Sequence, residues 1–198
     1  TALSSELGPQ KISEMSRPTL GIIGGGQLGS LLADAAKKLQ IKTVILSDDV
    51  NAPAKKFADQ FIYGNYEDNN SINKFINLVD LVTYEFENIP YEILKKIDEH
   101  KTVLPKPEIN KLIQNRYNEK DFLNKNNIQT TRYVLIKDIE DLKINKNFIP
   151  GLLKTCLLGY DGKGQYRLND LKDLNKDIDF TKEYILEKLI NLKKEISV

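Results

Sequence analysis

Short apolar runs alternate with stretches of helical periodicity along the first half of the chain. Residues 19–23 and 41–46 are apolar runs that predict buried strands, and apolar residues recur at helical spacing from residue 28 to about residue 39. A strand, a helix and a strand in this order predict a right-handed crossover between parallel strands. The pattern continues with predicted strands at 61–63, 81–83 and 102–104 and predicted helices at 70–78 and 90–99. We therefore expect an α/β domain.

The segment Pro105-Lys106-Pro107 interrupts this alternation. After it, a polar helix is predicted at 108–124 and a short helix at 139–142. Strands are predicted at 133–136, 149–154, 166–168 and 184–189, and the middle two flank a glycine-rich loop as in a hairpin. A further strand starts at 195–198, where the printed chain stops within the pattern, so we expect more protein to follow. The expected division is a disordered extension at 1–16, a Rossmann-like domain at 17–107 and part of a second domain at 108–198.

Composition narrows the classes of protein to consider. The 198 residues suffice for one sizeable core or two small ones, and a formal net charge of +1 predicts no strong attraction to nucleic acid or an anionic membrane. The single cysteine, Cys156, excludes an internal disulfide and fits a reducing cytoplasm. One histidine and one cysteine exclude a His/Cys metal cluster, and no apolar run approaches the roughly 20 residues of a membrane span.

Glycine is concentrated in two places: nine of the eleven glycines lie in residues 21–29 or 151–164. In the second place, Lys154 lies in an apolar strand that opens into a loop with three glycines and Lys163. Glycine lets backbone N–H groups approach an anion, and two ammonium groups can neutralise phosphate oxygens. The loop is not a Walker A motif, because Gln165 follows the last glycine. We interpret it as a clamp for a nucleoside triphosphate; the alternative, a hairpin with a solvated lysine, leaves Lys154 without an explanation.

The first glycine loop, Gly24-x-Gly26-x-x-Gly29, lies between a strand and a helix. This spacing is the fingerprint of a dinucleotide site, and Asp48 follows about 20 residues later at a strand end. A turn that binds a different phosphate ligand, or none, fits the spacing equally well. The segment Thr83–Asn88 follows a later strand, at the sheet edge where open α/β folds bind ligands. Its two carboxylates and one amide suit a polyol or an amine, or are ordinary loop polarity.

Several of these segments together resemble one family. They are Gly24–Gly29, Thr83–Pro90, Lys154 with Gly159–Gln165, and Glu187–Ile190 with Glu195–Val198. The chain resembles 5-(carboxyamino)imidazole ribonucleotide synthase, an ATP-grasp carboxylating enzyme of bacterial and fungal purine synthesis. The resemblance covers the chain from Leu20 to Val198, and the segments follow one another in the same order as in that family. The phrases Gly-Tyr-Asp-Gly-Lys-Gly-Gln and Thr-Tyr-Glu-Phe-Glu-Asn are the most specific. The resemblance implies a Rossmann-like pre-ATP-grasp domain at 17–107, followed by the first part of an ATP-grasp domain at 108–198.

The resemblance implies ATP, bicarbonate and 5-aminoimidazole ribonucleotide as substrates. Bicarbonate attacks the γ-phosphate to give carboxyphosphate, and the amine of the ribonucleotide captures the carboxyl group as a carbamate. Lysines and Mg²⁺ neutralise the charge that gathers on the phosphates. The resemblance puts the Mg²⁺ carboxylates beyond residue 198, so we expect residues 1–198 alone to be inactive. Members of this family are often dimers, so the resemblance also implies a possible homodimer, although no residue of the sequence by itself proves an interface.

The resemblance implies two sets of binding residues. The set for ATP is Arg116, Lys154, Gly159, Tyr160, Asp161, Gly162, Lys163, Gly164, Gln165, Glu187, Lys188, Leu189, Ile190 and Glu195. The set for the ribonucleotide is Gly24, Gly25, Gly26, Gln27, Leu28, Glu85, Glu87 and Asn88. In the first set, the resemblance implies that Lys154 contacts the phosphates, that Arg116 lies at the ATP site and that Gly159–Gln165 cover the triphosphate. Glu187–Ile190 are expected to line the adenine, and Glu195 is expected to bind the ribose hydroxyls. Cys156 and Leu157 depart from the pattern, since many relatives carry basic residues there.

Two functions of other classes stay open. An NAD-dependent oxidoreductase would use Gly24–Gly29 and Asp48, but it leaves Lys154 and the second glycine loop unexplained. The other is a non-catalytic nucleotide-binding module that is complete as it stands.

Overall fold

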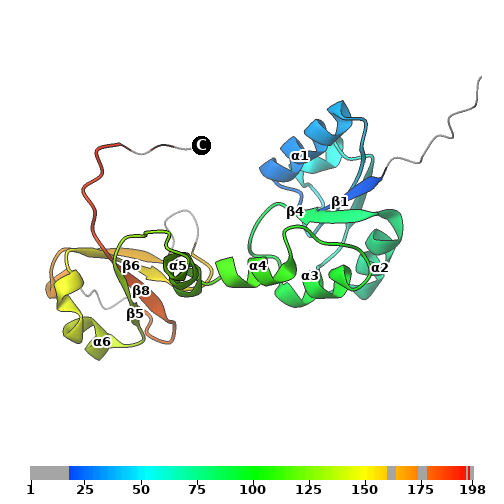
Figure 1. Ribbon diagram of the computed structural model, residues 1–198. Helices are drawn as coiled ribbons and strands as arrows, with labels where there is room; N and C mark the ends of the chain where they lie inside the picture. The colour runs from blue at the N-terminus through cyan, green and yellow to red at the C-terminus, as the bar shows by residue number, and fades with distance from the viewer. Residues whose placement is uncertain (1–17, 160–163, 174–177, 195, 197–198) are drawn as a thin grey trace, which may run out of the picture. The chain divides into compact units, whose positions relative to one another are not determined.

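The computed structural model of the chain describes residues 18–159, 164–173, 178–194 and 196. The chain divides between Pro105 and Lys106 into two compact units, each with its own sheet (Figure 1). The strand predicted at 195–198 lies outside the described residues except for Ile196. Within the described part of the chain, no helix is both long and apolar enough to cross a membrane.

The first unit is built on a parallel sheet with the strand order β3-β2-β1-β4. Its strands are β1 (Thr19–Ile23), β2 (Lys42–Ser47), β3 (Gln60–Tyr63) and β4 (Leu81–Tyr84), and its helices are α1 (Gln27–Lys38), α2 (Asn69–Leu78) and α3 (Tyr91–Asp98). Successive strands add to one side of β1, but β4 adds to the other. The loops that follow β1 and β4 therefore meet at a topological switch point, where open α/β folds bind their ligands.

Both faces of this sheet are covered, which explains why apolar residues follow one another without alternation in its strands, as at residues 44–46 of β2. Ile22 of β1 packs with Ala33 of α1 on one face. Ile23, the next residue, packs on the opposite face with Phe75 of α2 and Leu94 of α3. The α/β fold class and the parallel strands predicted from the sequence are confirmed.

Helix α1 packs on the sheet through its small residues. Its buried residues are Gly29, Ser30, Ala33 and Ala36. Leu28, Leu31 and Leu39 lie on the other side and are 58 %, 59 % and 70 % exposed. The spacing of the leucines located the helix correctly, but it did not indicate the face that packs. Small side chains bring the helix close to the sheet and its loops.

Two predicted elements are corrected. The strand expected at 102–104 is reduced to a single parallel bridge between Val82 and Val103, in which the N–H of Val82 donates to the carbonyl oxygen of Thr102 and the N–H of Leu104 donates to that of Val82. The polar helix expected at 108–124 is two helices, α4 (Pro107–Ile113) and α5 (Arg116–Lys125). The Asn115 side chain accepts hydrogen bonds from the N–H groups of Tyr117 and Asn118, so it caps α5 and starts a new helix.

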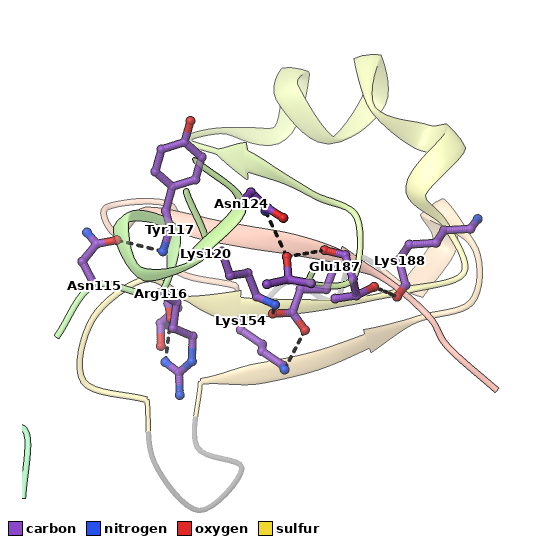
Figure 2. A network of polar contacts seen from close by, with 11 residues as sticks. Asn115, Arg116, Tyr117, Lys120, Asn124, Lys154, Glu187 and Lys188 are labelled. Atoms are coloured by element: carbon purple, nitrogen blue, oxygen red, sulfur yellow. Dashed lines mark hydrogen bonds and ion pairs between the residues drawn. The ribbon is translucent and has the colours of Figure 1, made fainter. Parts of the chain in front are cut away.

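The second unit holds an antiparallel sheet with the strand order β5-β8-β6-β7. Its strands are β5 (Tyr133–Ile136), β6 (Gly151–Thr155), β7 (Gln165–Leu168) and β8 (Tyr184–Lys188), and α6 (Ile139–Ile144) follows β5. The pairing of β6 with β7 confirms the hairpin predicted around the glycine loop. One face of the sheet carries the core, with Leu153, Leu186 and Leu142 fully buried. Lys154 and Glu187 alternate with these residues and so lie on the other face, beneath α5 (Figure 2).

Candidate functional site

The first glycine loop lies at the switch point and binds a carboxylate of the protein itself. Glu85 follows β4 directly, and its Oε1 accepts a hydrogen bond of 2.5 Å from the N–H of Gly26. Its Oε2 accepts a second one, also 2.5 Å, from the N–H of Gly29 in the first turn of α1. A carboxylate is stabilised at a helix N-terminus by the unpaired N–H groups and by the helix dipole. Glu85 thus occupies the position at which such a loop would hold an anion.

The glycines of this loop make room for Glu85. Gly24 has a φ of +101°, and a Cβ there would lie 2.5 Å from Cγ of Glu85. A Cβ at Gly26 would lie 2.7 Å from Oε1 of the same residue, and one at Gly29 would lie 2.8 Å from the carbonyl oxygen of Gly24. The spacing Gly-x-Gly-x-x-Gly is therefore required by contacts within the protein, before any ligand is considered.

These contacts weigh against the dinucleotide hypothesis. A pyrophosphate needs backbone donors at the helix N-terminus, and here the N–H groups of Gly26 and Gly29 already bind a negative charge. Asp48, the candidate partner for a ribose, lies against the hydroxyl of Tyr66. Burial raises the pKa of Tyr66, and the charge of Asp48 raises it further. Both features of the fingerprint are thus used within the protein.

The other residues predicted to face the ribonucleotide surround this loop. Gln27, Leu28 and Glu87 are exposed, and the Asn88 amide lies 3.4 Å from the Glu87 carboxylate. Gly25 is buried, and a Cβ there would lie 2.5 Å from that of Ala52. The fold brings the glycine loop and Glu85 into contact, while Glu87 and Asn88 lie beyond Glu85 along the same loop.

The second glycine loop is held at its base by a cation. The guanidinium of Arg116, in the first turn of α5, donates to the carbonyl oxygen of Thr155 at 2.9 Å and to that of Gly159. The backbone N–H of Arg116 also donates to the carbonyl oxygen of Cys156 at 2.9 Å. The polar helix that carries Arg116 is therefore docked on the end of β6, and Arg116 does not lie on a solvated face.

The glycines at the ends of this loop pack against Arg116 and Thr155. A Cβ at Gly159 would lie 2.5 Å from Nη1 of Arg116, and one at Gly164, where φ is +68°, would lie 2.7 Å from Oγ1 of Thr155. Gln165 begins β7. The remaining loop residues predicted to cover a triphosphate, Tyr160, Asp161, Gly162 and Lys163, lie outside the described residues, as does Glu195.

A cluster of three charged side chains lies next to this loop (Figure 2). Nζ of Lys154 is 2.7 Å from Oε2 of Glu187, and Nζ of Lys120 is 3.1 Å from Oε1 of the same carboxylate. Glu187 lies on a central strand and is only 6 % exposed, while the side chains of Lys154 and Lys120 are 24 % and 18 % exposed. The ammonium group of Lys154 in the apolar strand is thus paired, as its cost of burial requires.

The electrostatics of the cluster favour an ionised carboxylate. Burial alone raises the pKa of Glu187, but the hydrogen bond and charge of Lys154 and the charge of Lys120 outweigh it, so the pKa lies below its usual value. With Glu187 ionised, two ammonium groups share one carboxylate, and the cluster carries one net positive charge. A partly buried positive charge attracts an anion such as a phosphate.

The segment predicted to line adenine, Glu187–Ile190, makes several hydrogen bonds from its backbone to other parts of the chain. The N–H of Lys188 donates to the carbonyl oxygen of Arg132 at 2.8 Å, and the N–H of Leu189 donates to that of Pro150 at 3.1 Å. The hydroxyl of Thr131 donates to the carbonyl oxygen of Lys188 at 2.9 Å. These bonds hold the chain after β8 in one path, along which Ile190 is exposed.

The two residues that depart from the family pattern line a pocket beside the base of the loop. The pocket has a volume of about 540 Å³ and is lined by Thr155, Cys156, Leu157, Leu158, Gly164, Thr181, Lys182 and Glu183. Cys156 is buried, and burial together with the charge of Glu183 raises the pKa of its thiol to about 11. The thiol is therefore protonated near neutral pH, which fits a packing role.

Lys120 is the residue of this site that sequence reasoning missed. It lies four residues after Arg116, so both project from the same face of α5. That spacing was visible in the sequence, but the partner of Lys120 is Glu187, 67 residues further on.

Among the described residues, no group of three or more His, Cys, Asp or Glu side chains is placed to hold a metal ion.

Comparison with known proteins identifies both units. Residues 17–114 match the family described as "Ribonucleotide synthetase preATP-grasp domain", and residues 121–198 match "ATP-grasp domain". The chain is 38 % identical over 186 residues to an N5-carboxyaminoimidazole ribonucleotide synthase of Brucella melitensis, covering 91 % of this chain and 51 % of that protein. It is 36 % identical over 184 residues to the synthase of the same name from Staphylococcus aureus strain COL, covering 91 % of this chain and 49 % of that one.

A solved structure agrees with these matches. The crystal structure of N5-carboxyaminoimidazole synthetase from Staphylococcus aureus complexed with ADP has a TM-score of 0.81 to this chain at 35 % identity. The match covers 89 % of this chain and 48 % of that one. The chain thus spans about half the length of the relatives it matches.

Proposed function

The chain belongs to the ATP-grasp superfamily, and from that premise we propose that its second unit binds ATP for an N5-carboxyaminoimidazole ribonucleotide synthase. The observation that carries this proposal is the net positive cluster of Lys154, Lys120 and Glu187, which lies beside a glycine loop held by Arg116. Fixed cations and a glycine loop suit a triphosphate. The relative from Staphylococcus aureus was crystallised with ADP, which supports the nucleotide.

The reaction we propose proceeds in two steps. An oxygen of bicarbonate bonds to the γ-phosphorus of ATP, the bond to the β-phosphate breaks, and ADP leaves carboxyphosphate behind. The amine nitrogen of 5-aminoimidazole ribonucleotide then bonds to the carboxyl carbon, phosphate leaves, and the nitrogen loses a proton. Because the first step joins two anions, positive charge at the phosphates lowers its barrier. Lys154 is our candidate for this role in the chain.

The first unit is the proposed site of the ribonucleotide. The loop Gly24–Gly29 and Glu85 meet at the switch point, which is where an α/β sheet of this topology binds ligands. Because Glu85 already fills the helix N-terminus, we expect the ribonucleotide to meet an acidic surface there rather than a phosphate cradle. Hydroxyl and amine groups of the ligand suit such a surface.

We also propose that the reaction uses Mg²⁺, as the resemblance implies. The described residues include no group of three or more His, Cys, Asp or Glu side chains placed to hold the ion, so we derive no step through the metal.

We propose in addition that the protein forms a homodimer and is located in the cytoplasm. Sedimentation of the chain at several concentrations tests the homodimer, and cell fractionation tests the location.

Thermal unfolding of the full chain tests the proposal. A ligand that binds only the folded protein raises the midpoint of unfolding. We expect ATP and 5-aminoimidazole ribonucleotide each to raise the midpoint and NADH to leave it unchanged. The matched variant Lys154→Met should lose the shift with ATP and keep the shift with the ribonucleotide, since the two sites lie in different units. A shift with NADH alone would contradict the proposal and favour the oxidoreductase.

A further inference from the structure

The carboxylate of Glu187 binds two lysines, and the proposed ATP site accounts for one of them. We propose that Lys120 is a positioning residue, which holds Glu187 in place and compensates its charge when Lys154 turns to a nucleotide phosphate. This inference rests on the proposed function, because it assigns Lys154 to ATP. It assigns Lys120 a role that acts through Glu187 and not by contact with the nucleotide.

Glu187 competes with a nucleotide phosphate for the ammonium group of Lys154. That ammonium group lies 2.7 Å from Oε2 of Glu187. To neutralise a phosphate, Lys154 must give up part of this contact or share it. Glu187 is 6 % exposed, so water cannot take the place of the departing cation. A buried carboxylate that loses its only cation is strongly destabilised.

Lys120 is placed so that Glu187 keeps a cation when Lys154 leaves it. Lys120 binds the other carboxylate oxygen, Oε1, at 3.1 Å, so its contact does not depend on the position of Lys154. It comes from a different element, α5, whereas Lys154 comes from β6 (Figure 2). Its ammonium group also lies 5.9 Å from the centre of the Tyr133 ring, and that ring packs edge-on against Tyr117 of α5. Lys120 is thus fixed from both sides.

The balance of charge in the cluster also requires the second lysine. With one carboxylate and two lysines, the cluster is positive by one charge before the nucleotide arrives. When Lys154 pairs with a phosphate oxygen, Lys120 and Glu187 remain as a neutral pair. Without Lys120 the cluster would start neutral, and every contact of Lys154 with phosphate would be made at the expense of Glu187. The second lysine therefore releases the first for the nucleotide.

Affinity for ATP in a double-mutant cycle tests this inference in the full chain. Lys120→Met should raise the Kd for ATP by about tenfold or more, because Lys154 is then held by Glu187 alone. Lys120→Arg, which keeps the charge, should restore most of the affinity. In a Glu187→Gln background the carboxylate is gone, and Lys120→Met should change Kd by no more than about twofold. An equal loss in both backgrounds would overturn the inference, since Lys120 would then act independently of Glu187.

Titration of the Glu187 carboxyl by ¹³C NMR provides a second test without any nucleotide. In Lys154→Met the pKa of the carboxyl should stay lower than in Lys154→Met/Lys120→Met, because Lys120 remains. In Lys154→Met/Lys120→Met burial should raise its pKa above the usual range of glutamate. If the pKa rises as far in Lys154→Met as in the double variant, the inference is wrong. A wild-type chain that fails to bind ATP would contradict the proposed function, and this titration would still decide the role of Lys120.

Discussion

The two glycine loops follow strands in both units, yet they are built around opposite charges. In the first, Glu85 lies between the glycines and accepts hydrogen bonds from Gly26 and Gly29. In the second, Arg116 lies at the base of the loop and donates to the carbonyl oxygens of Thr155 and Gly159. Close backbone approach is common to both loops; the charged side chain packed against each one differs.

A glycine pattern therefore does not identify a phosphate site by itself. The spacing of the first loop fits a dinucleotide fingerprint, but its donors are used by a carboxylate of the protein. The second loop is not a Walker A motif, but it lies beside a cluster with a net positive charge. The side chains brought in from distant elements decide the chemistry of each loop.

The largest expected effect comes from removing the shared carboxylate of the second unit. Glu187→Ala leaves two partly buried lysines without an anion and should reduce the free energy of unfolding by about 3 kcal/mol. Denaturation in urea, followed by circular dichroism, measures this change. Glu187→Gln keeps the shape and should cost less. Equal stability of Glu187→Ala and wild type would show that the cluster does not organise this unit.

A substitution in the first loop tests whether its glycines serve Glu85. A Cβ at Gly26 would lie 2.7 Å from Oε1 of Glu85, so Gly26→Ala should destabilise the chain by about 2 kcal/mol. In a Glu85→Ala background the clash is absent, and the same substitution should be nearly neutral. The urea midpoints of the four proteins give the comparison. A similar loss in both backgrounds would mean that the loop needs glycine for another reason.

Acid should destabilise the second unit by protonating Glu187. Its pKa is lower in the folded chain than in the unfolded one, so the unfolded state binds more protons as the pH falls. The stability that this provides is complete above the usual pKa of glutamate and is lost as the pH falls through the lower folded value. Glu187→Gln should remove this part of the pH dependence. Urea midpoints of wild type and Glu187→Gln, measured between neutral pH and pH 3, would show this difference. If the midpoints of both proteins fell equally steeply with pH, Glu187 would not be the group that responds to acid.

A small gain in stability is expected beside the second loop. Leu158 has a φ of +56°, in the left-handed region, and its side chain is 74 % exposed. Leu158→Gly should therefore raise the free energy of unfolding by up to about 1 kcal/mol, because glycine adopts this conformation without strain. Leu157→Gly, at the neighbouring residue whose φ is not positive, serves as the control and should give no gain. A fall in the unfolding midpoint of Leu158→Gly would contradict this reading.

Local patterns in the sequence were sufficient to predict most strands and the hairpin, because apolar runs and glycines act over short distances. The cap at Asn115 is also a local signal, yet the polar run around it was interpreted as one helix. The face of α1 that packs on the sheet could not be predicted from the apolar pattern, because the buried residues are the small ones and the leucines are exposed. The ion cluster required tertiary information: Glu187 reaches Lys154 only through the pairing of β6 with β8, and Lys120 only through the docking of α5.

The most direct test of the account is ¹⁵N NMR of the wild-type chain during titration with ATP. We expect the amide signals of Thr155, Gly164 and Glu187 to shift, while those of Gly26 and Gly29, which donate to Glu85, stay in place. Shifts at Gly26 and Gly29, with the second loop unchanged, would contradict it. They would mean that phosphate displaces Glu85 and that the first glycine loop is the nucleotide site.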